Sequence, residues 1–105
     1  MTATPCQIVL TTCPDAASAE RIARALVEEK LAACVNMLPP MRSIYRWEGQ
    51  IEDATEQLLV IKTAQQFAVV RDRIRSLHPY ELPEIITVPI ADGLPDYLAW
   101  LRNPE

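Results

Sequence analysis

The residues best suited to chemistry lie together between positions 78 and 81. His78 is the only histidine in the chain of 105 residues, so any reaction or metal site that needs an imidazole must use it. Tyr80 and Glu81 follow directly, and Pro79 and Pro83 stiffen the segment, which holds polar groups in place at low entropic cost. The pattern fits a ligand site, and it also fits a structural loop.

The chain has three cysteines, Cys6, Cys13 and Cys34. An odd number without framework spacing is typical of free thiols in a reducing compartment. Cys6 and Cys13 flank a predicted strand and lie too far apart along it for a disulfide. We expect Cys13 near the sheet edge, open to solvent. Cys34 is either a small core residue or a copper or redox thiol.

A second group of polar and aromatic residues lies on two strands joined by a tight turn at 48–49. Gly49 supplies the positive φ that such a turn needs. Tyr45 and Trp47 lie near the turn, where aromatic side chains serve an interface or a ligand pocket. Glu56 and Lys62 are six residues apart and therefore share one strand face, either as an ion pair between subunits or as the lining of a polar cleft.

The elements that must position these residues alternate along the chain. We expect strands at 7–12, 33–47 (interrupted at Pro39-Pro40), 51–63 and 84–90, and helices at 15–30, 65–77 and 94–101. The order β-α-β-β-α-β predicts one α+β domain over residues 1–105, a ferredoxin-like sandwich with a C-terminal helix. Both helices then cover one face of the sheet. The other face is apolar and exposed in a monomer, which predicts a homo-oligomer.

Composition excludes several classes of function. A net charge of −4 disfavours nucleic acid as the partner, because phosphate binding needs clustered Lys and Arg. No apolar run approaches the ~20 residues of a membrane span, and we expect a cytoplasmic location. No catalytic motif of the GxSxG or HExxH type occurs. We therefore do not expect an enzyme, although a cysteine–His78 couple remains formally open.

Four segments resemble hallmarks of the CutA family of divalent-cation tolerance proteins. They cover most of the chain in the right order: Leu31-Ala32-Ala33-Cys34-Val35-Asn36, Tyr45-x-Trp47-x-Gly49-x-Ile51 followed by Glu56 and Ile61-Lys62-Thr63, His78-Pro79-Tyr80-Glu81-x-Pro83-Glu84-Ile85, and Asp96-Tyr97-Leu98-x-Trp100-Leu101. The resemblance implies a tight homotrimer, related in shape to the PII signalling proteins, which hold small ligands between subunits. It also implies a role in metal tolerance.

The resemblance is incomplete where copper is concerned. Members linked to copper carry a cysteine on the first strand and a second histidine, and this chain has Thr11 and Leu77 at those positions. One imidazole makes a weak copper site. We predict weak binding of Cu(II) or another divalent metal, with His78, Glu81 and Cys34 as candidate ligands.

The combined expectation is a trimeric binding or signalling module with shared clefts. Lys62 would favour a small anionic metabolite there, and a purely structural scaffold is the remaining alternative. The predicted cleft comprises Tyr45, Trp47, Glu56, Lys62, His78, Tyr80 and Glu81.

Overall fold

The computed structural model describes residues 4–104 and contains five strands and three helices in that range. Their order is β1, α1, β2, β3, β4, α2, β5 and α3, as predicted. The predicted second strand is split into two, and the remaining ends differ from prediction by at most two residues. The bounds are β1 Gln7–Cys13, α1 Ala16–Glu28, β2 Cys34–Met37, β3 Met41–Trp47, β4 Gln50–Thr63, α2 Phe67–Leu77, β5 Ile85–Pro89 and α3 Pro95–Arg102.

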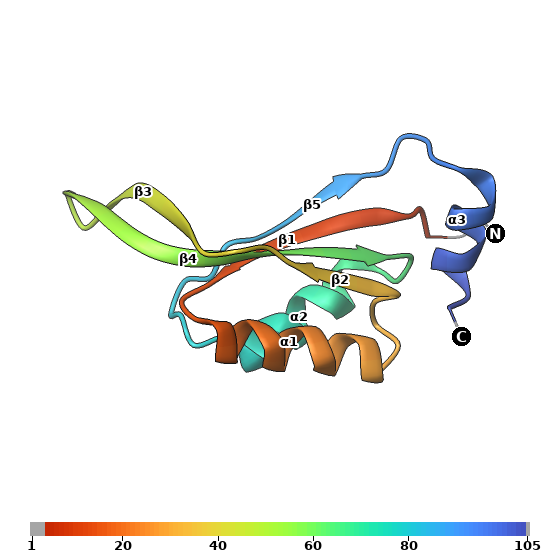
Figure 1. Ribbon diagram of the computed structural model, residues 1–105, viewed down its shortest axis with the longest axis horizontal. Coiled ribbons are helices and arrows are strands. Elements are labelled where there is room, and N and C mark those ends of the chain that lie inside the picture. Colours follow the sequence, from red (N-terminus) through yellow and green to blue (C-terminus); the bar gives the residue numbers. More distant parts are fainter. Residues whose placement is uncertain (1–3, 105) are drawn as a thin grey trace.

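The sheet has the order β2-β4-β1-β5, and every neighbouring pair is antiparallel. β2 and β3 pair with successive parts of β4, so they form one strand broken at Pro39-Pro40. Prolines cannot donate to a ladder, which explains the break. Both α1 and α2 lie under the same face of the sheet (Figure 1). The α+β ferredoxin-like arrangement predicted from the element order is confirmed for a single chain.

The first helix begins at a side-chain cap. The carboxylate of Asp15 accepts a hydrogen bond of 2.8 Å from the backbone N–H of Ser18, which satisfies one of the free donors of the first turn. This bond lowers the pKa of Asp15. The predicted apolar face of α1 is confirmed, since the residues at i, i+3, i+4 and i+7 are all buried: Ala19, Ile22, Ala23 and Leu26.

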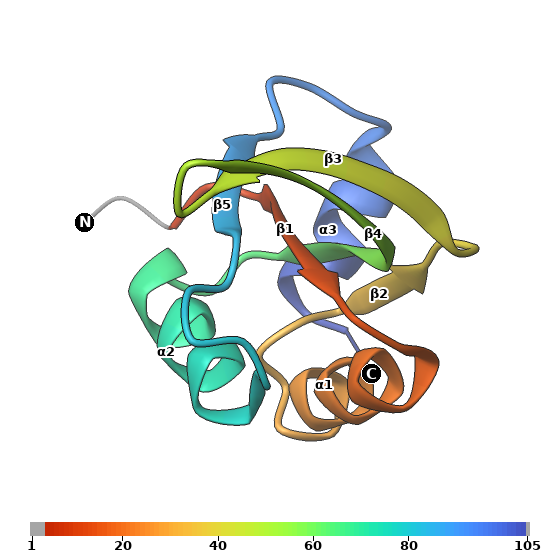
Figure 2. The ribbon, with the colours of Figure 1, turned by 90° about the vertical axis from the view of Figure 1, so that its left-hand side faces the viewer.

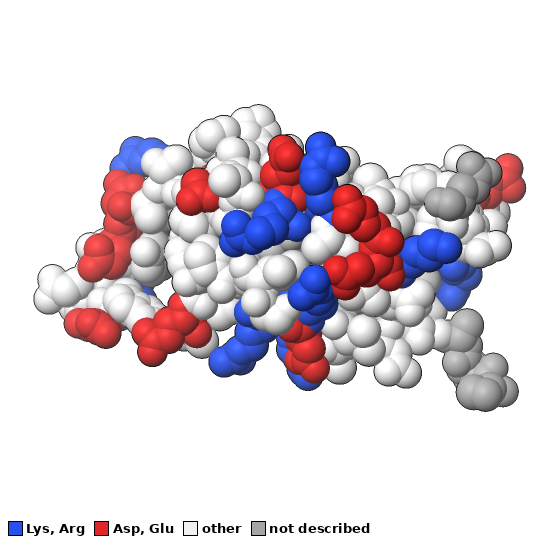
Figure 3. All heavy atoms as spheres, turned by 90° about the horizontal axis from the view of Figure 1, so that it is seen from below, with Lys and Arg blue, Asp and Glu red and all other residues white. Residues whose placement is uncertain are grey.

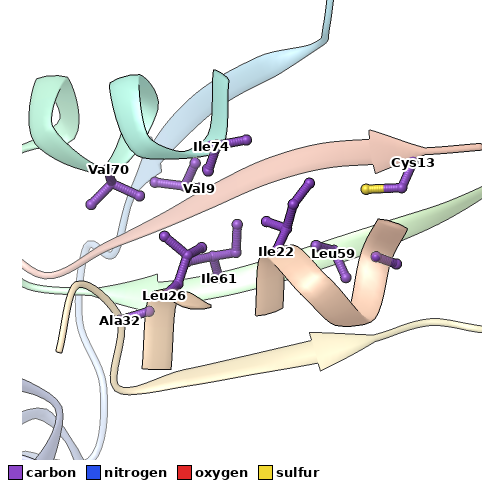
Figure 4. Close-up of a cluster of buried hydrophobic side chains, with 10 residues drawn as sticks. Val9, Cys13, Ile22, Leu26, Ala32, Leu59, Ile61, Val70 and Ile74 are labelled. Carbon is purple, nitrogen blue, oxygen red and sulfur yellow. The ribbon is translucent and has the colours of Figure 1, made fainter. Parts of the chain in front are cut away.

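The core lies between the helix layer and the sheet (Figure 4). From α2, Val70 and Ile74 are fully buried, while Phe67 and Leu77 pack at its margin. From the sheet, the odd-numbered residues of β1 and β4 point into it, as the two-residue period of a strand requires. These are Val9, Cys13, Leu59 and Ile61.

The N-terminal half of β4 leaves the sheet and forms a two-stranded arm with β3 (Figures 1 and 2). β4 has 14 residues, and the molecule measures 46 Å along its longest axis. The arm turns at Glu48 and Gly49, whose φ angles are 48° and 79°. Two successive positive φ values define the hairpin turn that matches strand twist. The predicted turn is confirmed, and Glu48 adopts the same left-handed backbone conformation as Gly49.

Apolar side chains gather on the part of the sheet face opposite the helices that β4 and β5 contribute. Ile86 and Val88 of β5 are 48% and 44% exposed. Leu58 and Val60 of β4 are half-buried on the same face, because they alternate with the core residues Leu59 and Ile61. The predicted exposed apolar face is therefore present in the single chain.

The remaining surfaces are less distinctive. Seen from the helix side, Lys and Arg intermingle with Asp and Glu over the helices (Figure 3), as on a solvated helix face. α3 lies at the end of the molecule away from the arm (Figure 1). Within residues 4–104, no helix is long and apolar enough to cross a membrane.

Candidate functional site

A groove of about 970 Å³ lies where the arm leaves the sheet. One wall is the arm, the floor comes from the outer face of β1 and β4, and the other wall is the segment 80–84. Its size falls in the range of small-molecule sites, which are mostly apolar with a few polar groups. The lining residues are Leu10, Thr12, Met41, Ser43, Ile44, Tyr45, Trp47, Glu56, Leu58, Tyr80, Glu81, Leu82, Pro83 and Glu84.

A buried carboxylate forms the polar centre of the groove. Glu56 is only 7% exposed, and its Oε2 accepts a hydrogen bond of 2.7 Å from the phenol of Tyr80. Burial raises the pKa of Tyr80, and the adjacent Glu56 carboxylate raises it further. Tyr80 therefore stays a neutral donor, which is the form that a carboxylate needs as its partner.

His78 lies beneath the groove and does not line it. Its Nδ1 accepts a hydrogen bond of 3.1 Å from the backbone N–H of Tyr80, so the ring proton belongs on Nε2. Nε2 lies 2.8 Å from the carbonyl oxygen of Thr12 and donates to it. His78 is 9% exposed. Both ring nitrogens are thus engaged, and neither offers a free lone pair to a metal.

The prediction that Cys13 lies exposed near the sheet edge is wrong. It lies in the core with 0% exposure, because the last residues of β1 still pair with β4 and lie over the helices. Burial raises the pKa of its thiol to about 11, and the nearby carboxylates of Asp15 and Glu56 add to the shift. Its Sγ lies 4.0 Å from Nε2 of His78.

Lys62 and Cys34 lie together at a different place on the sheet. They are paired across β2 and β4, and Nζ of Lys62 is 4.0 Å from Sγ of Cys34 and bonded to Asn36. Lys62 is six residues from Glu56 along β4, which corresponds to about 20 Å. Glu56 and Lys62 do share a face, yet they cannot line one pocket of a single chain.

The structure thus brings together five of the seven residues predicted for the cleft and separates two. The groove holds Tyr45, Trp47, Glu56, Tyr80 and Glu81, whereas His78 lies below it and Lys62 lies outside it.

Sequence reasoning missed three groups of lining residues: residues 82–84 of the groove wall, the floor on β1 and β4, and Met41, Ser43 and Ile44 of β3. Glu84 belongs to the same motif as His78 and Tyr80, and the even-numbered residues of β1 and β4 follow from the strand period. Those two signals were available in the sequence. No such signal pointed to Met41, which reaches the groove because β3 pairs with β4.

The three candidate metal ligands do not form a site in one chain. Within residues 4–104, no three His, Cys, Asp or Glu side chains are gathered so that they could hold a metal ion. Glu81 lies in the groove wall, His78 beneath it, and Cys34 beside Lys62. The residues present do not fit a closed metal centre, which takes several converging donors.

Comparison with known proteins identifies the family. The model of the "CutA1 divalent ion tolerance protein" matches residues 7–104. The "Divalent-cation tolerance protein CutA" of Thermus thermophilus is 50% identical over 98 residues, which are 92% of this chain and 95% of that protein. This chain therefore belongs to the CutA1 divalent ion tolerance protein family.

Solved structures agree with this assignment. The Thermus thermophilus protein superimposes with a TM-score of 0.89 at 49% identity, over 92% of this chain and 95% of that one. A structure from Archaeoglobus fulgidus, described as a "Periplasmic divalent cation tolerance protein CutA", gives 0.88 at 44% identity, over 91% and 94%. "Protein CutA, chloroplastic" of Arabidopsis thaliana is 40% identical over 94% of this chain and 55% of that protein. The fold and the family predicted from the four motifs are confirmed.

Proposed function

We propose that this chain is a homotrimeric binding or signalling module that serves divalent-cation tolerance, with the groove as its binding site. Family membership supports the tolerance role. The Glu56–Tyr80 pair supports the site, because a buried carboxylate held by one neutral hydroxyl is costly in a structural role. Perturbed titratable groups in a concave site are a recognised sign of function.

The proposed assembly rests on two surfaces. The outer sheet face exposes Ile86 and Val88, and the arm exposes Ile44 and Ile51 by 68% and 64%. Apolar area of this kind is characteristic of association sites. A trimer would place the groove next to another copy, which would make it a cleft between subunits. Sedimentation should give three times the chain mass, and a stable monomer at micromolar concentration contradicts the assembly.

A non-catalytic role agrees with the chemistry of the thiol–imidazole pair. The nucleophile of a cysteine enzyme is the thiolate. Burial keeps the pKa of Cys13 at about 11, and its side chain is inaccessible from the groove. Cys13 beside His78 is therefore a packed thiol, and we infer binding without turnover.

The alternative of an anionic metabolite depended on Lys62. Because Lys62 does not line the groove, a second copy would have to bring a positive charge to it. The groove of one chain instead carries Glu56, Glu81 and Glu84. Its own charge disfavours an anion.

Direct binding of Cu(II) or another divalent metal is the second candidate, and the family description supports it. Because His78 is engaged on both nitrogens, binding there requires the ring to leave its partners. We expect such binding to be weak. If His78→Ala leaves copper affinity unchanged, the metal ligands lie elsewhere and the cysteines become the candidates.

A thermal-shift comparison separates the two candidates. Wild-type protein, Trp47→Ala and His78→Ala are each tested with Cu(II), Zn(II) and a panel of small metabolites. A groove site predicts that Trp47→Ala loses the response to an organic ligand and keeps any response to metal. If no organic compound shifts the unfolding temperature, and metals shift it through His78, the metal candidate replaces the groove. A cytoplasmic location stays a prediction.

A further inference from the structure

The carboxylate of Glu56 has an unused hydrogen-bonding oxygen. Oε2 is bonded to Tyr80, whereas Oε1 accepts no hydrogen bond from any of residues 4–104. Glu56 lines the groove and is 7% exposed. Oε1 is not among the fully buried polar atoms without a partner in the described chain, so it stays accessible from the groove. A buried charge needs an opposite charge or several donors. Glu56 has one neutral donor, the phenol of Tyr80, and has neither a positive charge nor a second donor beside it in the described chain.

The rest of the groove has the same sign of charge. Glu81 and Glu84 lie in its wall, and no lysine, arginine or histidine is found among its described lining residues. A concave surface lined by one sign of charge concentrates ions of the opposite sign. The groove therefore attracts cations.

The walls add a preference for an organic body on that cation. Tyr45 and Trp47 are 44% and 41% exposed and line the groove beside the apolar side chains of Leu10 and Leu58. Aromatic faces attract an ammonium or guanidinium group electrostatically, and tryptophan does so most strongly. A bare divalent ion would find one buried carboxylate and no gathered set of ligands among residues 4–104. It would also gain nothing from the apolar walls.

We propose that the groove recognises a small organic cation, whose primary ammonium or guanidinium group donates to Oε1 of Glu56 and whose apolar body packs on Tyr45 and Trp47. This inference rests on the proposed function, because it names the ligand class of the same groove. The occupant is a free small molecule. A cationic side chain from a second copy is the competing occupant, and the experiment distinguishes the two.

The test is calorimetric titration of the full chain with three probes of similar size. These are 2-phenylethylammonium, its neutral analogue 2-phenylethanol, and the anion phenylacetate. The cation should bind, the alcohol should bind at least about tenfold more weakly, and the anion should not bind. That ratio follows from exchanging a charged hydrogen bond for a neutral one.

Two variants attribute the effect to Glu56. Glu56→Gln keeps an acceptor for Tyr80 and removes the charge, so it should weaken the cation about tenfold to 100-fold and leave 2-phenylethanol unchanged. Glu52→Gln is the matched control, because it removes one carboxylate from the same strand outside the groove lining. If Glu56→Gln does not fold, the exposed double variant Glu81→Gln/Glu84→Gln should still lower cation affinity severalfold.

The outcomes are separable. If the alcohol binds as tightly as the cation, the ligand class is wrong while the groove remains a site. If none of the three probes binds, the proposal is overturned. If, in addition, Trp47→Ala leaves every metabolite-induced thermal shift unchanged, the groove is not a binding site at all. If the cation binds only as the oligomer dissociates in parallel sedimentation runs, a second copy occupies the groove and the proposal is overturned.

Discussion

The phenol of Tyr80 donates a hydrogen bond of 2.7 Å to the carboxylate of Glu56, joining the segment after α2 to the base of the arm. The two residues are 24 positions apart. The bond therefore links the groove wall at residues 80–84 to β4, which contributes to the groove floor. It fixes the position of the buried charge on which the proposed recognition depends.

Removing the phenol hydroxyl should destabilise the protein. Tyr80→Phe leaves the Glu56 carboxylate buried without its donor, and hydrogen bonds to charged groups contribute about 1.5–3 kcal/mol. Urea unfolding should show a loss of that size. Tyr45→Phe is the matched control, since Tyr45 lines the same groove, is 44% exposed and should change stability by less than about 0.5 kcal/mol. Equal losses in the two variants would contradict this account of the pair.

A second prediction concerns the hydroxyl of Thr11, which is buried without a hydrogen-bond partner within the described chain. Replacing it by a methyl group of the same shape removes an unsatisfied polar atom, so Thr11→Val should stabilise the fold by about 1 kcal/mol. Thr63 gives the contrast. Its equally buried hydroxyl donates to Leu31 and accepts from Gln65, and Thr63→Val should cost about 1–3 kcal/mol. Thermal unfolding of both variants measures these changes. A lower stability of Thr11→Val than of the unchanged protein would contradict the prediction.

The cysteines should differ in reactivity. Cys34 is half-buried, whereas Cys6 and Cys13 are 5% and 0% exposed. A thiol reagent at pH 8 should label one cysteine of the folded chain within minutes and all three after denaturation. Peptide mapping should locate the label on Cys34. Rapid labelling of Cys13 would show that the end of β1 is open.

The raised pKa of Cys13 also predicts a pH dependence of stability. The unfolded thiol ionises near its ordinary pKa of 9.0, and the folded thiol only at about 11. The unfolded chain therefore binds fewer protons in that interval, and the free energy of unfolding falls as pH rises from 9 to 11. The raised pKa of Tyr80 acts in the same direction. Cys13→Ala should flatten this fall relative to Cys34→Ala, and identical slopes would contradict the prediction.

The arm turn offers a stabilising substitution. Glu48 and Gly49 both have positive φ, and Asn-Gly is the preferred pair for such a turn. Glu48→Asn should therefore raise stability by a few tenths of a kcal/mol, whereas Gly49→Ala should lower it by about 1–2 kcal/mol through backbone strain alone. A methyl group at position 49 would meet no atom beyond the adjacent residues within 4 Å, so the cost comes from the local backbone conformation. Calorimetric melting of both variants provides the measurement.

Much of the fold could be predicted because the spacing of apolar residues along the sequence shows which face of a helix or strand is buried. The spacing of Ala19, Ile22 and Leu26 identified the buried face of α1, and Pro39-Pro40 located the break between β2 and β3. The site could be predicted only in part. The shared face of Glu56 and Lys62 follows from a period of two, but only Glu56 lies where the arm meets the segment 80–84, and that meeting is a tertiary contact.

The inward position of His78 shows the other limit. Its neighbours in the sequence are proline, tyrosine and glutamate, which suggest an exposed polar loop. Its burial depends on the end of β1, where the carbonyl of Thr12 accepts a hydrogen bond from the ring. That contact joins residues 66 positions apart, and no local pattern contains it.

The measurement that tests the central claim most directly is a fluorescence titration of a chain whose only tryptophan is Trp47. The chain has two tryptophans, and Trp100 lies on α3, outside the groove, so Trp100→Phe isolates the groove signal. Adding 2-phenylethylammonium should change the Trp47 emission saturably, and adding Glu56→Gln should weaken that binding about tenfold or more. An emission that does not respond, or that responds equally with and without the Glu56 charge, would contradict the assignment of the groove as a cation-binding site.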